Sequence, residues 1–182
     1  MSHASPALAF TIPAEPQVLA AARSLAARIG ADQAISRAVL NATMREHFGG
    51  SDAEGRWSVR DAHAALELAQ VLFLADESEL VTAVSLELAD RTFSRLEALV
   101  PSQTTRSDEQ IEWQQFATPP RIAWLSARAC AIVAGELVLE PSAGTGMLGI
   151  WAAKAGARLA LNEISPLRRE CLGALFPEAT VT

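Results

Sequence analysis

The stretch of sequence that decides the fold is Leu137-Val-Leu-Glu-Pro-Ser-Ala-Gly-Thr-Gly-Met-Leu-Gly149. It opens on the short apolar run that is typical of a buried strand, and a turn with two glycines then leads into a helical pattern. Gly144 and Gly146 carry no Cβ atom, so the backbone can approach a ligand closely at both positions. The helix that follows would point its free N–H groups toward the same place, where open α/β sheets bind nucleotide-like ligands.

The same alternation of strand and helix continues downstream. Residues 159–161 predict a second strand, Ser165-Pro166 starts a helix that runs to Leu175, and residues 179–182 begin a third strand. Strands that alternate with helices at this spacing form βαβ units, in which the strands are parallel and the crossovers right-handed. We therefore expect an α/β fold with a partial Rossmann-like domain, whose parallel sheet is truncated after the third strand.

The region upstream reads as helical. Apolar residues recur at helical spacing over residues 18–29 and 34–44. A further apolar helix starts after Ser58, where Asp61 completes the pattern of a capping box. One more helix is expected over residues 76–99, so this region is expected to be a helical module.

A polar segment, residues 101–107, divides the chain. It follows a predicted helix and is the best candidate for a linker. We therefore expect a helical module over residues 1–107 and an α/β half-domain over residues 108–182. Within the half-domain, Thr118 is predicted to cap a helix whose first turn holds Pro119.

Composition limits the classes of protein to which the chain can belong. Half of its 182 residues are hydrophobic and a fifth are charged, a balance that is typical of a globular protein and argues against a disordered chain. No apolar run reaches the roughly 18 residues needed to span a bilayer, and residues 1–10 lack the pattern of a secretory signal. Two cysteines and three scattered histidines form no metal-ligand pattern. We expect a soluble, cytoplasmic protein with no membrane partner and no metal site.

The charge of the chain bears on its partners. The formal net charge is −6, from 15 basic and 21 acidic side chains, and the whole acidic surplus lies in residues 1–110. Such a chain is a poor nucleic-acid binder on its own, because affinity for phosphate comes mainly from Lys and Arg. If DNA is the substrate, the basic surface must lie on a partner or on a missing part of the protein.

Two carboxylates flank the glycine turn. Glu140 ends the first predicted strand, and Glu163 follows the second, where it could accept hydrogen bonds from both hydroxyls of a ribose. Each also has a structural interpretation, because Glu140 could cap its own loop and Glu163 could cap the helix that starts at Ser165. The spacing Gly-x-Gly-x-x-Gly matches a dinucleotide fingerprint, which is weak evidence alone. Glu140 would repel a pyrophosphate but could pair with an ammonium group.

Three segments together carry a resemblance to a known class: Phe116-Ala-Thr-Pro119, Leu139-Glu-Pro-Ser-Ala-Gly-Thr-Gly146 and Leu161-Asn-Glu163. They resemble the S-adenosylmethionine-dependent DNA methyltransferases that methylate amino groups, of the N6-adenine type. More narrowly, the chain is similar to the N-terminal methylase region of strawberry-notch-like methylase/helicase proteins. The resemblance covers roughly residues 111–182 and implies the cofactor-binding half of a methyltransferase domain.

The resemblance also implies a set of residues that bind S-adenosylmethionine. Phe116 and Thr118 would lie over the methionine end, and Glu140 would face the methionine ammonium. Glu163 would hold the ribose diol, and Ile164 would pack against adenine. The full set of expected cofactor-binding residues is Phe116, Thr118, Glu140, Pro141, Ser142, Gly144, Gly146, Glu163 and Ile164.

The chain departs from the class in one respect. Amino-methylating enzymes carry an acid or amide, two prolines and an aromatic residue that hold the target amine and stack the flipped base. Nothing after Glu163 matches this motif, and Thr118-Pro119-Pro120-Arg121 has only the proline pair. We therefore expect no catalytic residue here and no methylation by the chain unaided. The first strand would then be an exposed edge, which predicts self-association or docking of the helical module over it.

Two other functions are consistent with the same residues. One is a nicotinamide-binding Rossmann fragment of an oxidoreductase, against which Glu140 and the Phe116-Ala-Thr-Pro119 segment weigh. The other is a non-catalytic helical module for interaction and assembly. Cofactor binding would distinguish them from the methyltransferase hypothesis.

Overall fold

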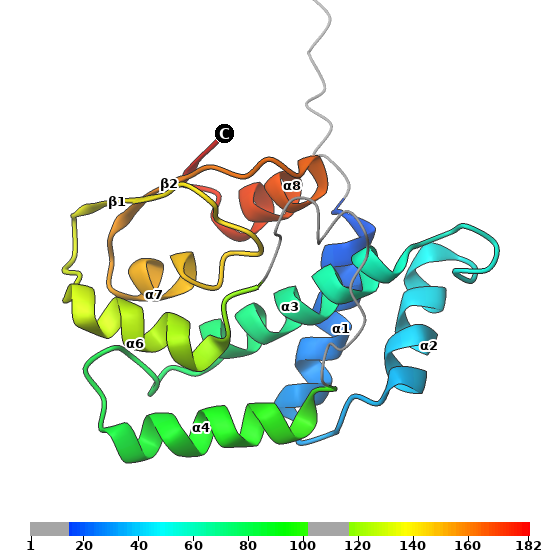
Figure 1. The fold of residues 1–182 in the computed structure, drawn as a ribbon, viewed down its shortest axis with the longest axis horizontal. Helices are drawn as coiled ribbons and strands as arrows, with labels where there is room; N and C mark the ends of the chain where they lie inside the picture. Colours follow the sequence, from blue (N-terminus) through cyan, green and yellow to red (C-terminus); the bar gives the residue numbers. More distant parts are fainter. Residues whose placement is uncertain (1–14, 102–116) are drawn as a thin grey trace, which may run out of the picture.

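The computed structural model describes residues 15–101 and 117–182 (Figure 1). The helical part, residues 15–101, contains α1 (Gln17–Gly30), α2 (Arg37–Phe48), α3 (Val59–Asp76) and α4 (Leu86–Leu99). The α/β part, residues 117–182, contains α6 (Pro120–Cys130), β1 (Leu137–Glu140), α7 (Gly149–Lys154), β2 (Arg158–Leu161), α8 (Pro166–Leu175) and β3 (Thr180–Val181). In these two segments, no helix combines the length and the apolar character that crossing a bilayer requires.

The three strands form one small parallel sheet in the order β1-β2-β3. Leu137 pairs with Arg158 at the start of the first two strands, and Leu161 pairs with Val181 between the second and the third. α7 connects β1 to β2, and α8 connects β2 to β3, so that each crossover is a helix. The predicted parallel βαβ arrangement is confirmed, and its membership of a Rossmann-like domain stays a prediction.

Serine side chains set the start of three helices in the helical part. Ser36, Ser58 and Ser85 each accept a hydrogen bond from the backbone N–H three residues later, which satisfies a donor that the helix leaves free. At Ser58 the Asp61 carboxylate completes the pair by accepting from the Ser58 backbone N–H at 2.8 Å. The capping box expected from the sequence is confirmed.

The prediction of a single helix over residues 76–99 is wrong for the first part of that range. α3 continues through Asp76, and α4 begins only at Leu86, directly after its cap Ser85. The apolar residues between the two helices had the spacing of a helix. The backbone N–H groups of Leu80 and Val84, however, bond to Glu77 O and Val81 O in short turns that do not continue as a helix.

Carbonyl groups of the segment before α4 accept hydrogen bonds from side chains of α6. Trp124 Nε1 donates to Val81 O at 3.1 Å, and Arg128 Nη1 donates to Thr82 O at 2.8 Å. These long-range contacts give the two carbonyls hydrogen-bond partners without a local helix. The segment between α3 and α4 thus joins the helical part to α6.

One hydrophobic core continues from the helical part into the α/β part. The ring centroid of Phe93 on α4 lies 6.0 Å from that of Trp124 on α6 and 6.3 Å from that of Trp151 on α7. All three side chains are buried, and aromatic pairs at this spacing add stability beyond the area that they bury. The two segments predicted from the sequence therefore fold around shared side chains.

Basic side chains of the α/β part reach into the acidic helical part. Lys154 at the end of α7 donates to the carbonyls of Leu74, Ala75 and Glu77 at 3.0, 3.2 and 2.9 Å. These contacts satisfy acceptors that the end of α3 leaves free. Burial lowers the pKa of Lys154, while the neighbouring Glu77 and Asp76 act in the opposite direction. α7 is thereby attached to the end of α3.

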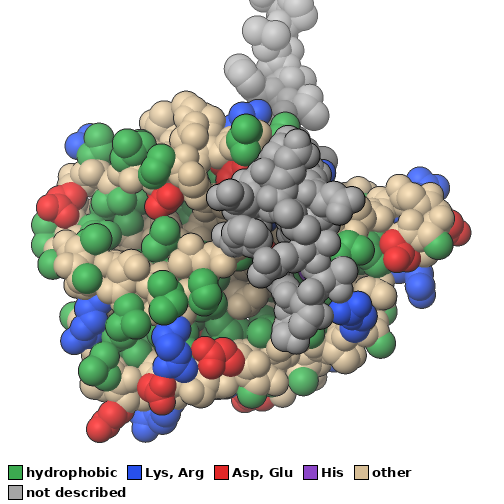
Figure 2. Space-filling view, in the orientation of Figure 1, with side chains coloured by type: hydrophobic (Ala, Val, Ile, Leu, Met, Phe, Trp, Pro, Cys, Tyr) green, Lys and Arg blue, Asp and Glu red, His purple; other side chains and the backbone are tan. Residues whose placement is uncertain are grey.

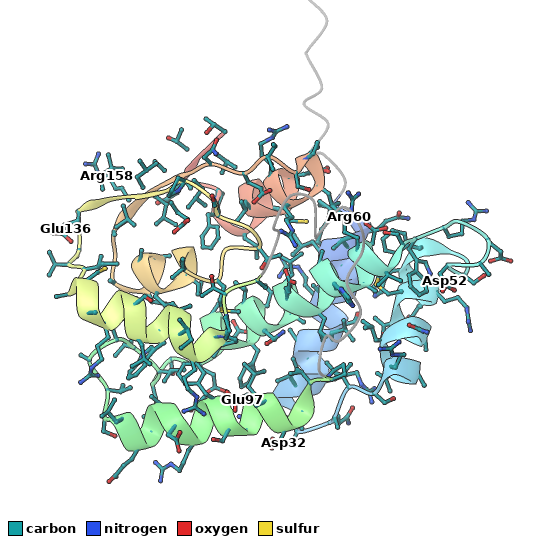
Figure 3. All side chains as sticks on the ribbon, viewed as in Figure 1. Asp32, Asp52, Arg60, Glu97, Glu136 and Arg158 are labelled. Atoms are coloured by element: carbon teal, nitrogen blue, oxygen red, sulfur yellow. The ribbon has the colours of Figure 1, made fainter. Side chains whose placement is uncertain are left out.

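Arg121 makes a similar connection from α6 to α4. Its guanidinium pairs with Asp90, and its Nε lies 3.4 Å from Glu97 Oε1. Figure 3 shows Glu97 on the side of α4 that faces α6. The acidic surplus of the first part of the sequence is therefore partly compensated by basic side chains of the second.

The outer face of β1 is exposed. Leu137 and Leu139 project from this face and are 63 % and 68 % exposed, whereas Val138 packs against the core. Figure 2 shows hydrophobic side chains at the surface over the part of the molecule where β1 and β2 lie. The described helical part contacts α6, α7 and α8 instead. Docking of residues 15–101 over this strand, as the sequence predicted, is therefore not seen.

Candidate functional site

The glycine turn between β1 and α7 is held by backbone hydrogen bonds. Ala143 N donates to Asn162 O at 2.9 Å, which ties the turn to the residue after β2. Gly146 N in turn donates to Ala143 O at 2.9 Å. Gly144 and Gly146 have φ of 58° and 91°, a left-handed conformation that favours glycine. The turn is therefore a defined loop beside the end of β2.

The two glycines have different surroundings. A Cβ atom on Gly146 would lie 2.7 Å from Cε2 of Phe176, so glycine allows that ring to pack against the turn. A Cβ atom on Gly144 would meet nothing within 4 Å. Close approach by a ligand, which the sequence suggested for both positions, therefore fits Gly144. At Gly146 a side chain of the protein already fills the space.

Glu163 follows β2 and is only 6 % exposed. Its Oε2 accepts from Gly144 N and its Oε1 from Ser165 N, both at 2.8 Å. The carboxylate thus joins the glycine turn to Ser165, the N-cap residue of α8, whereas no side chain caps the first turn of that helix. Its role is structural, as one of the two interpretations above proposed, but it is not a helix cap. Each carboxylate oxygen can accept a further hydrogen bond, and the neighbouring Ile164 is 68 % exposed. The predicted ribose and adenine contacts stay predictions.

Glu140 caps its own loop. Its Oε1 accepts a hydrogen bond from Ser142 N at 3.2 Å. Next to it, the carbonyl of Pro141 accepts from Asn162 Nδ2 at 2.9 Å, so this side of the turn is also tied to the end of β2. The three predicted site residues at the tip of β1 are therefore part of one hydrogen-bonded loop.

Thr118 is not the cap of α6. The helix begins at Pro120, Pro119 occupies the N-cap position, and no side chain caps it. The reason is local, because Pro120 has no N–H at the first helical position and its ring presets a helical φ. The other residue predicted in this segment, Phe116, lies outside the described residues.

A cavity of about 270 Å³ lies between the start of α6, the glycine turn and α3. Thr118 lines it from the segment before α6, Thr145 and Met147 line it from the glycine turn, and Glu67 and Gln70 line it from α3. Of the described residues that the resemblance assigns to the cofactor, Thr118 alone lines this cavity. The cavity therefore brings the Phe-Ala-Thr-Pro segment and the glycine turn together, and adds a helix that the sequence did not connect with them.

Glu67 is a buried carboxylate in α3. It is 4 % exposed and Arg168 of α8 is 5 % exposed, with Glu67 Oε2 and Arg168 Nη2 3.4 Å apart. Burial raises the pKa of Glu67 to about 7, although the Arg168 charge and a hydrogen bond with the Thr145 side chain act to lower it. A buried ionisable group at the wall of a cavity is a candidate functional group. Within the described segments, no three His, Cys, Asp or Glu side chains are placed to hold a metal ion.

Sequence reasoning missed both members of this pair. Glu67 stands alone among apolar residues in the middle of a helix, and a charge in that position is seldom buried without a partner. That signal could have identified Glu67. No sequence signal connects it to Arg168, which lies 101 residues away.

Comparison with known proteins gave no significant match to a family model, a curated protein or a solved structure. The resemblance of residues 111–182 to amino-methylating DNA methyltransferases therefore stays a prediction.

Gly146→Ala should lower the free energy of unfolding by about 2–4 kcal/mol, because the new methyl group overlaps Phe176 and alanine disfavours this φ. Gly144→Ala is the control, since it also places alanine at a positive φ but meets no neighbouring atom, and it should cost about 1–2 kcal/mol. Urea unfolding of both variants measures the difference. Equal losses would mean that Phe176 does not constrain the turn.

The stability of the protein should depend on pH through Glu67. Because the folded pKa is the higher one, between about pH 4.5 and 7 the folded state keeps a proton that the unfolded state has lost. The free energy of unfolding should fall as the pH rises through this window, by on the order of 3 kcal/mol from this group. The double variant E67M/R168M should lose that part of the slope. Urea unfolding of the wild type and the double variant at about pH 5 and pH 8 measures this pH dependence. If the double variant keeps the pH dependence of the wild type, groups other than Glu67 cause it.

Proposed function

We propose that this chain is the S-adenosylmethionine-binding part of a methyltransferase that acts on an amino group of DNA. The observation that carries the proposal is the cavity of about 270 Å³, because two segments of the resembling region line it together. Thr118 belongs to the Phe-Ala-Thr-Pro segment, and Thr145 belongs to the glycine turn. Hydroxyl groups beside an apolar wall suit a ligand with a polar amino-acid end on an apolar linker.

The residues around the turn have the chemistry that this cofactor would need. Glu163 has acceptor capacity left for a ribose diol, and Gly144 leaves the backbone open to a close approach. The exposed side chain of Ile164 offers an apolar contact for an adenine ring. When bound, S-adenosylmethionine supplies a methyl group activated by its sulfonium. The contribution of these residues would be to bind and orient it.

The chain is not expected to methylate DNA alone. Its proline pair, Pro119-Pro120, forms the start of α6, and Arg121 after it pairs with Asp90 of α4. This segment therefore lacks the acid or amide and the aromatic residue that hold and stack a target base. With a net charge of −6, contacts to DNA would come from a partner or from another region of the protein.

Calorimetric titration and thermal unfolding with S-adenosylhomocysteine test the proposal. Binding should raise the free energy of unfolding by about 2.7 kcal/mol at a ligand concentration of about 100 times Kd, and NAD should have no effect. Stabilisation by NAD alone would favour a fragment of a nicotinamide-dependent oxidoreductase. A defined oligomer that binds neither ligand would favour a non-catalytic assembly module.

Glu163→Gln should weaken binding of S-adenosylhomocysteine by about tenfold or more, because hydrogen bonds to a charged acceptor are stronger than those to an amide. Glu136→Gln is the matched control. That carboxylate also accepts a backbone N–H, from Val133 at 3.0 Å, but it lies at the opposite end of β1 (Figure 3). Thermal unfolding without ligand separates loss of binding from loss of fold. If the E163Q variant and the wild type bind S-adenosylhomocysteine with equal affinity, Glu163 does not contact the ligand.

Self-association through β1 is a further part of the proposal. Leu137 and Leu139 expose apolar surface on this strand, and an exposed apolar strand at a sheet edge favours pairing between chains. Sedimentation velocity should show association that increases with concentration, and Leu139→Glu should weaken it without lowering the melting temperature by more than a few degrees. A wild-type chain that stays monomeric at all concentrations would contradict this.

A further inference from the structure

Two acidic side chains are candidates to bind an ammonium group in the proposed cofactor site. Glu140, to which the resemblance assigns this role, lies at the tip of β1 and accepts from Ser142 N at 3.2 Å. Glu140 is not among the residues that line the cavity shared by Thr118 and Thr145, whereas Glu67 is. The carboxylate at the wall of this cavity therefore comes from the helical part.

The negative charge of Glu67 is incompletely balanced by its neighbours. Arg168, with Nη2 3.4 Å from the carboxylate, and the Thr145 side chain both favour the ionised form. Desolvation outweighs them, so that the pKa of Glu67 is raised to about 7. In a poorly solvated place, a second positive group nearby would stabilise the ionised carboxylate substantially.

The rest of the cavity wall would accept the amino-acid end of a ligand. Thr118 and Thr145 contribute hydroxyl groups, and Gln70, one turn after Glu67 on α3, contributes an amide. Among the described residues that line the cavity there is no Lys or Arg. A ligand cation would therefore meet a carboxylate and neutral polar groups at this wall.

We propose that Glu67 of α3, rather than Glu140, binds the ammonium group at the amino-acid end of S-adenosylmethionine. This assignment rests on the proposed function. It makes the helical part a component of the cofactor site, since Glu67 of α3 and Thr145 of the glycine turn line the same cavity.

Two ligands test the assignment. S-adenosylhomocysteine has the amino-acid end, and 5′-methylthioadenosine lacks it. The wild type should bind both, and Glu67→Gln should bind S-adenosylhomocysteine at least about tenfold more weakly while its affinity for 5′-methylthioadenosine is unchanged. Glu140→Gln should leave the ratio of the two affinities as in the wild type. Glu136→Gln is the control for a carboxylate remote from the cavity.

A second variant is needed because Glu67→Gln leaves Arg168 buried without its carboxylate, which can unfold a protein. The variant E67M/R168M replaces the buried pair with apolar side chains of similar volume, a change that is often neutral or stabilising. It should show the same selective loss of S-adenosylhomocysteine binding. Thermal unfolding without ligand establishes that each variant is folded.

The outcomes separate the two proposals. If the wild type binds neither ligand, the proposed function fails and the assignment of Glu67 fails with it. If the wild type binds both and the selective loss follows Glu140→Gln, the proposed function stands and the Glu67 assignment is wrong. A folded E67M/R168M variant that keeps the wild-type ratio of affinities, or loses both ligands equally, would also refute the assignment.

Discussion

The candidate site depends on the packing of α3 against the glycine turn and α8. The Glu67–Arg168 pair lies in this contact, with both side chains almost fully buried. A buried ion pair is costly because both charges lose their hydration. The Arg168 charge and the Thr145 side chain both favour the ionised carboxylate, but burial outweighs them and raises the pKa of Glu67. A change in the position of α3 would therefore alter the wall of the cavity and the surroundings of the turn together.

The turn itself is organised by the protein before any ligand is considered. Glu163 accepts from Gly144 N and Ser165 N, and Asn162 O, directly after β2, accepts from Ala143 N. These contacts give the carboxylate a structural role that does not exclude contact with a ligand, because lone pairs remain on both oxygens. A loop that is already fixed would lose little conformational entropy on binding.

The strands, the crossover helices and the capping box at Ser58 could be predicted from the sequence because local patterns determine them. The sequence did not indicate that the helix expected over residues 76–99 begins only at Leu86. Between the two helices the chain forms short turns, and the carbonyls of Val81 and Thr82 accept from the side chains of Trp124 and Arg128 on α6. Where tertiary contacts compete with local spacing, spacing alone gives the wrong element.

The candidate site, like the fold, could be predicted only in part from the sequence. The position of Glu163 beside the turn follows from its place at the end of a parallel strand. The contribution of Glu67 does not follow from local sequence, because it arises when α3 packs on a loop that lies far along the chain. Thr118 was predicted at the site for its part in a motif and lines the cavity, but its expected capping role was wrong.

The contact between Gly146 and Phe176 has a consequence for the order in which the molecule can assemble. The ring that fills the space beside this glycine comes from a residue 30 positions later, after the end of α8. During synthesis, β1 and the loop after it would leave the ribosome before that ring is available. The packing of this loop against the ring can therefore form only after α8 has been synthesised, so this part of the structure is completed late.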